Sequence, residues 1–275
     1  MSKLATFAIA LLIAPAGLRA QGQPLDPWKR IPALPTTCYT DNDFRGSLTN
    51  LHAALGDEQR QQDEINMALE QKFGEMDMQE KMQKMMEYMR KDPQKAQKMM
   101  QAQQAAASAI TSDITDGDDA KKERNAEFAK LSAAFNSEMD AAAKPFRARR
   151  DEIMKTSRRV LGEGENWEFT TKAAQDEYNS LIDKENADYE ARCATYFGAN
   201  GKMVAWLASY RETALDPVAR ATEANDEIKT TQMVILDSPG AGFRSTAQMT
   251  AAREYISAVQ KAYDLRRPKL KRVER

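Results

Sequence analysis

The sequence has little of what catalytic and metal sites are usually made of. Its 275 residues include one histidine, His52, and two cysteines. A single histidine cannot build a histidine-based zinc site, and the His-Glu-x-x-His motif is absent. The chain also lacks a Walker-type phosphate loop, a dinucleotide-binding loop and a Gly-x-Ser-x-Gly elbow. We therefore predict that the protein is not an enzyme and that it has no catalytic residues, no metal site and no cofactor.

Long apolar runs and a strong charge of one sign are also missing. Beyond residue 20, no apolar run approaches the roughly 20 residues that a membrane-spanning helix needs. The formal net charge is −1 although 29% of the residues are charged, whereas nucleic-acid-binding domains are usually strongly basic. These absences predict a protein without a transmembrane anchor and without a nucleic-acid partner.

The N-terminus has the three parts of a secretory signal. A positive residue, Lys3, precedes an uncharged run from Leu4 to Ala16, and Ala20 supplies a small residue at a cleavage site. The apolar run is too short to serve as a stable membrane anchor. We predict that residues 1–20 are a cleaved signal peptide and that the protein is periplasmic or secreted.

The two cysteines, Cys38 and Cys193, lie far apart in the sequence. In an oxidising compartment a lone pair of cysteines usually forms one disulfide. The bridge would close a loop of about 155 residues and would stabilise the fold by about 4–5 kcal/mol if the loss of chain entropy dominates. No Cys-x-x-Cys redox motif is present, so we interpret the predicted bridge as structural.

Apolar residues recur at helical spacing along most of the chain. On the first such stripe, Phe44, Leu48, Leu51 and Leu55 are three or four residues apart, which is typical of an amphipathic helix. Heptad-like spacing returns further on, and no segment shows convincing strand alternation. The predicted fold is all-α, either an elongated helical bundle or antiparallel coiled-coil hairpins, and such stripes can also pair with a second copy of the chain.

Breaks in the helical pattern divide the chain into regions. Residues 21–40 contain four prolines and predict an extended leader. Residues 41–161 form a long-helix, coiled-coil-like region, and residues 162–267 form a C-terminal helical region in which Glu185 falls on an otherwise mostly apolar face. Residues 268–275 form a basic tail.

A methionine-rich segment at 76–100 is the most unusual feature of the sequence. Four of its methionines are spaced four, three and four residues apart, so that they share one helix face. The face is a core seam, a surface for a protein partner, or a Cu(I) or Ag(I) site, because thioethers are flexible, apolar and soft. The candidate partner-binding methionines are Met78, Met82, Met85, Met86 and Met89.

The methionine-rich composition of segment 76–100, together with the export signal of the chain, is similar to that of the methionine-rich helical periplasmic chaperones of the envelope-stress type. The Leu-Thr-x-x-Gln signature of those chaperones is absent, so no family is assigned. The resemblance implies a helical protein that binds other proteins in the cell envelope.

Two further groups of residues are candidates for contacts with partners. Trp206 and Tyr210 either pack around the region of Cys193 or form a patch for a protein partner. Basic residues crowd one helical stretch, where they either form local ion pairs in solvent or bind an anionic envelope partner. The candidates for the anionic partner are Arg147, Arg150, Arg158 and Arg159.

The sequence as a whole therefore predicts an exported, non-enzymatic helical binding protein. It would act as a scaffold or chaperone-like factor of the cell envelope, with a protein partner there. The alternative prediction is the handling of a soft metal, Cu(I) or Ag(I), through the methionine-rich segment.

Overall fold

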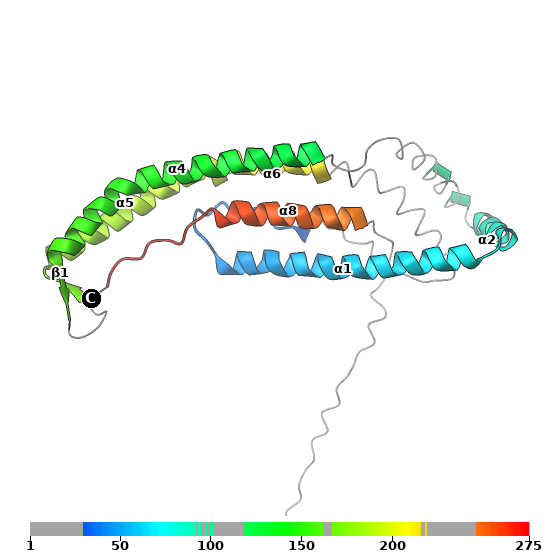
Figure 1. Cartoon of the computed structure of the whole chain (residues 1–275), viewed down its shortest axis with the longest axis horizontal. Helices are drawn as coiled ribbons and strands as arrows, with labels where there is room; N and C mark the ends of the chain where they lie inside the picture. The colour runs from blue at the N-terminus through cyan, green and yellow to red at the C-terminus, as the bar shows by residue number, and fades with distance from the viewer. Residues whose placement is uncertain are drawn as a thin grey trace, which may run out of the picture.

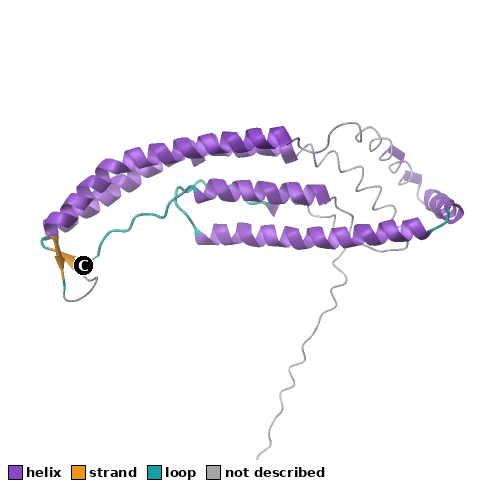
Figure 2. Cartoon of the chain, in the orientation of Figure 1, coloured by secondary structure: helices purple, strands orange, loops and turns teal. Residues whose placement is uncertain are grey.

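The computed structural model describes residues 30–91, 93, 94, 97, 100, 101, 118–161, 167–215, 218 and 246–274. The predicted signal peptide and most of the first half of the leader, residues 1–29, lie outside the described residues, as does the side chain of Met89. Helices make up most of the described chain, so the predicted all-α class is confirmed (Figure 2).

Two antiparallel helix pairs form the body of the molecule (Figure 1). Helix α1 (Asn42–Glu75) packs along α8 (Thr246–Asp264), and α4 (Asp118–Ser157) packs along α5 (Lys172–Phe197) as a long, curved hairpin. Pro145 lies inside α4, which nevertheless continues unbroken to Ser157. The arrangement is the elongated, hairpin-based bundle that the periodicity predicted.

Short elements join the two pairs. Helix α6 (Lys202–Tyr210) contacts α4, α5 and α8, and a π-helical turn, η2 (Arg211–Leu215), continues it. Helix α2 (Met78–Lys91) follows α1 after a two-residue break and lies at the far end of the molecule (Figure 1). No helix among the described residues is both long and apolar enough to cross a membrane.

A small antiparallel sheet closes the other end of the α4–α5 hairpin. Strand β1 (Arg158–Val160) pairs with β2 (Trp167–Phe169), with Arg158 opposite Phe169 and Val160 opposite Trp167. Periodicity had predicted helix through residue 161 and no strand. Three-residue strands are too short to show the alternation by which a strand is recognised.

Local sequence explains where α1 and α5 begin and why the chain can turn after α5. Asp41 caps α1 by accepting a hydrogen bond from the Asp43 amide at 2.9 Å, and Thr171 caps α5 by accepting one from the Ala174 amide at 3.2 Å. After α5 the chain turns so closely that a side chain at Gly201 would collide with the carbonyl of Tyr196. Glycine is therefore required there for α6 to fold back on the bundle.

The core lies where α1, α4, α5, α6 and α8 meet. Phe135 of α4 is only 1% exposed and packs edge-on against Tyr196 and Phe197 of α5, with ring centroids 5.1 and 5.4 Å apart. Leu48 and Leu55 of α1 are fully buried in the same cluster. The predicted apolar stripe of the first helix therefore faces this core.

Candidate functional site

Three methionines of α2 lie on the surface rather than in a core seam. Met78, Met82 and Met86 are 74%, 58% and 57% exposed, and Met85 is half-buried. The three exposed residues are four positions apart, so they form one stripe along the helix. We call these three residues the methionine face. Their exposure leaves a partner surface and a soft-metal site as the interpretations to be distinguished.

Trp206 and Tyr210, the other two candidates for a protein partner, belong to the core. Their side chains are 5% and 8% exposed. The Trp206 ring lies 5.0 Å from that of Phe128, and the Arg124 guanidinium lies 4.8 Å from the Tyr210 ring centroid. These contacts hold α6 against α4, so the described structure places neither residue on a surface where a partner could bind.

The four candidate residues for an anionic partner all have partners within the chain. Arg147 pairs with Asp140 at 2.6 Å, and Arg159 pairs with Glu168 across the small sheet. The Arg158 guanidinium lies 5.4 Å from the Trp167 ring centroid. Arg150 is largely buried and pairs with Glu185. The structure thus brings these arginines into local ion pairs and ring contacts rather than into one open basic surface.

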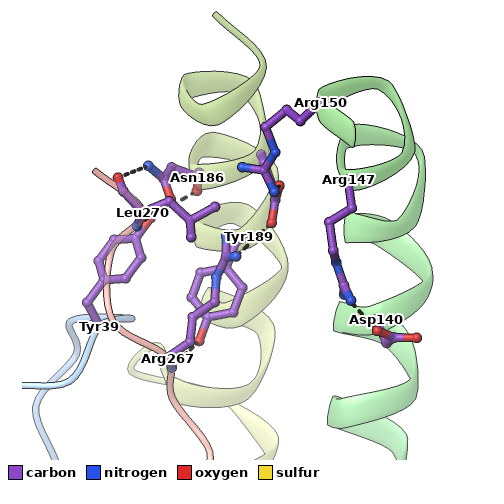
Figure 3. A network of polar contacts seen from close by, with 9 residues as sticks. Tyr39, Asp140, Arg147, Arg150, Asn186, Tyr189, Arg267 and Leu270 are labelled. Carbon is purple, nitrogen blue, oxygen red and sulfur yellow. Dashed lines mark hydrogen bonds and ion pairs between the residues drawn. The ribbon is translucent and has the colours of Figure 1, made fainter. Parts of the chain in front are cut away.

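Glu185 is the centre of a buried polar network, and Figure 3 shows its two partners, Arg150 and Arg267. Its side chain is 3% exposed and faces two arginines, Arg150 from α4 and Arg267 from the chain after α8. Arg267 donates a hydrogen bond to Oε1 at 2.7 Å, and Arg150 Nη2 lies 2.7 Å from Oε2 as an ion pair without hydrogen-bond alignment. The Arg267 guanidinium also lies 4.4 Å from the ring centroid of Tyr189. The network therefore links α4, α5 and the C-terminal segment.

A cavity of about 330 Å³ adjoins this network. Its volume is within the range of small-molecule sites. Charges of both signs line it, so its electrostatics favour neither an anion nor a cation. Its lining includes Phe135, Met139, Ala143, Arg147, Glu185 and Arg267.

Cys38 and Cys193 come together as the disulfide prediction requires, but the structure does not confirm the bond. Both residues are buried free cysteines that lie 2.6 Å apart. Burial, together with the neighbouring Cys38, raises the pKa of the Cys193 thiol. A thiol in this state is a poor nucleophile, so the geometry suits a structural pair better than a catalytic one.

His52 is partly buried on α1 near Arg253. Burial lowers the pKa of His52, and the positive charge of Arg253 lowers it further. Within the described ranges, no cluster of three or more histidine, cysteine, aspartate or glutamate side chains could hold a metal ion.

Comparisons with known proteins give no relative of this chain. No protein family matches the sequence, and neither a curated protein nor a solved structure matches at a significant level. The functional assignment therefore depends on the chain's own residues.

Proposed function

We propose that the protein is an exported helical binding factor of the cell envelope that acts without catalysis. Its functional surface is the methionine face, and its partner is an apolar segment of another protein. The observation that carries the proposal is the exposure of Met78, Met82 and Met86 on one short helix at the end of the molecule.

The chemistry of the methionine face favours an apolar protein segment. Methionine side chains are unbranched and adapt their shape, so they suit partners of varied sequence. The ion pairs of α2 hold its charged side chains among themselves: Lys84 lies 3.8 Å from Glu80 and Lys91 lies 2.9 Å from Glu87. The charged residues thus keep the helix soluble while the methionine face remains available.

Export is part of this proposal. A cleaved signal at residues 1–20 would place the protein in the periplasm or outside the cell, where client proteins arrive unfolded after translocation. A buried cysteine pair suits such an oxidising compartment.

Soft-metal handling is the second candidate, and the spacing of the same residues supports it. Methionines four positions apart on a helix have Cβ atoms about 6 Å apart, so two thioethers can approach one Cu(I) or Ag(I) ion. A metal site needs the sulfur atoms, whereas a protein-binding surface needs only apolar side chains.

Two triple variants of full-length mature protein distinguish these functions. In the first, Met78, Met82 and Met86 become leucine, which keeps the apolar surface and removes sulfur. In the second they become glutamine, which keeps the approximate size and helix propensity and removes the apolar surface. Circular dichroism should be the same for both and for the wild type, because the side chains are exposed.

The assay is the suppression of thermal aggregation of citrate synthase, beside a Cu(I) titration. We expect the leucine variant to protect as well as the wild type. The glutamine variant should need at least tenfold more protein, since three lost apolar contacts of on the order of 1 kcal/mol each exceed the roughly 1.4 kcal/mol of a tenfold change. Equal protection by the glutamine variant would contradict the proposed surface. Cu(I) binding that both variants lose, without any protection by the wild type, would favour the soft-metal function.

A further inference from the structure

Residues 268–274 of the C-terminal tail lie along α5, where two asparagine side chains of the helix hydrogen-bond to the backbone of the tail. After α8 the described tail runs as an extended loop toward the small sheet, antiparallel to α5 (Figures 1 and 2). Asn186 donates from Nδ2 to the Leu270 carbonyl at 3.0 Å and accepts from the Leu270 amide at 3.3 Å (Figure 3). Asn179 does the same with Val273, at 3.1 and 2.9 Å.

The spacing of the two asparagines matches an extended peptide. Asn179 and Asn186 are seven residues apart on a helix, which corresponds to about 10.5 Å along its axis. Leu270 and Val273 are three residues apart, which corresponds to about 10 Å of extended chain. Each carboxamide therefore meets both the amide and the carbonyl of one residue, and Gln175 adds a hydrogen bond to the Val273 carbonyl at 3.1 Å.

Acidic side chains on α5 add selectivity for charge. Arg272 pairs with Asp183 through two hydrogen bonds, one of 3.0 Å from Nε, and Lys269 Nζ lies 3.6 Å from Glu190. The side chains of Arg272 and Lys269 are 65% and 63% exposed. The α5 surface thus recognises an extended backbone and two basic side chains, with little apolar burial.

These contacts do not depend on the tail being part of this chain. Arg267 is fixed before the tail by Glu185, by the Tyr189 hydroxyl at 3.2 Å and by the Thr40 amide at 3.2 Å. Residues 269–274 could therefore leave α5 while Arg267 and the core stay in place. Pro268 is exposed and has no amide hydrogen to lose.

We propose that this face of α5 is a binding site for an extended basic peptide of a partner protein, and that the chain's own tail is its intramolecular occupant. Asn179 and Asn186 bind the peptide backbone, and Asp183 and Glu190 select basic side chains. The site is separate from the methionine face, so its test is independent of the proposed function.

The experiment measures how a labelled peptide with the sequence of residues 268–275 binds to full-length protein. In one variant, Leu270→Pro and Val273→Pro remove the two tail amides that Asn186 and Asn179 bind. The matched control is Lys271→Pro, because Lys271 is exposed and its amide makes none of these hydrogen bonds. We expect the double-proline variant to bind the peptide about tenfold more tightly than the wild type, since two lost hydrogen bonds weaken the competing tail. The control should bind like the wild type.

Two additions identify the site. Asn179→Ala with Asn186→Ala in the double-proline background should weaken the peptide about tenfold or more, whereas Ser180→Ala on the exposed side of α5 should have no effect. A peptide with glutamate in place of Lys269 and Arg272 should also bind more weakly. Equal peptide affinity with and without the asparagines would overturn the proposal.

A measurement on the wild type avoids any effect of the variants on folding. Excess unlabelled peptide should accelerate hydrogen exchange at the Leu270 and Val273 amides, because it displaces the tail. Unchanged exchange at a peptide concentration that saturates the double-proline variant would mean that the tail is a fixed structural element, and would overturn the proposal.

Discussion

Replacing Glu185 with glutamine should destabilise the protein far more than the same change at a surface position. Glu185 is 3% exposed and is the only acidic group paired with both Arg150 and Arg267 among the described residues. Each ion pair contributes an attraction of about 4 kcal/mol at an effective dielectric constant of 20, which desolvation of the charges partly offsets. Glutamine keeps the shape of the side chain, removes both attractions and leaves two arginines facing each other.

The expected loss is about 3 kcal/mol in the free energy of unfolding. Removing one partner of a buried ion pair costs roughly 3–5 kcal/mol, and we take the lower value because the Arg267 side chain is 26% exposed. The matched control is Glu190→Gln on the same helix, whose partner Lys269 is 63% exposed, so its loss should stay below about 1 kcal/mol. Urea denaturation measures both. A loss at Glu185 no larger than that at Glu190 would refute the idea that this network holds α4, α5 and the C-terminal segment together.

The remaining predictions concern the ends, the cysteines and pH. Exported protein should begin at Gln21, as N-terminal sequencing will show, and an N-terminus at Met1 would exclude signal cleavage. Intact mass before and after reduction and alkylation should reveal one Cys38–Cys193 disulfide, and Cys193→Ser should lower stability by up to about 4–5 kcal/mol; two free thiols in exported protein would contradict this. Burial raises the pKa of Tyr189 to about 12, whereas tyrosine in an unfolded chain ionises near about 10. The contribution of Tyr189 to stability should therefore be fully present below pH 10 and be lost between pH 10 and 12, as the free energy of unfolding from urea titrations will show. Tyr189→Phe should reduce that fall, and a variant whose free energy of unfolding falls as steeply with pH as that of the wild type would contradict this role of Tyr189.

Periodicity predicted the helical architecture because each helix buries a stripe of apolar residues. The stripe containing Leu48 and Leu55 indicated which face of α1 would meet the core, and both residues are fully buried. Glu185 also gave a sequence signal, since a carboxylate on an apolar helix face needs charged partners. Those partners could not be identified, because Arg267 is 82 residues away in the chain.

Other features could not be predicted from periodicity or composition. Asn179 and Asn186 look like ordinary polar residues of a helix until the tail is placed beside them. Trp206 and Tyr210 have the composition of either a core or a binding patch, and only the packing of α6 against α4 decides between them. Methionine spacing likewise gave a helix face without saying whether a neighbour covers it.

Methyl NMR of methionine-labelled protein tests the central claim most directly. A soluble, permanently unfolded probe, reduced and carboxymethylated α-lactalbumin, would be added to the mature protein. Met203 and Met249 serve as internal controls, because they are 0% and 2% exposed. The methyl signals of Met78, Met82 and Met86 should shift or broaden with saturation while those of the controls stay in place. Unchanged signals from the methionine face in the presence of bound probe would contradict the proposed function.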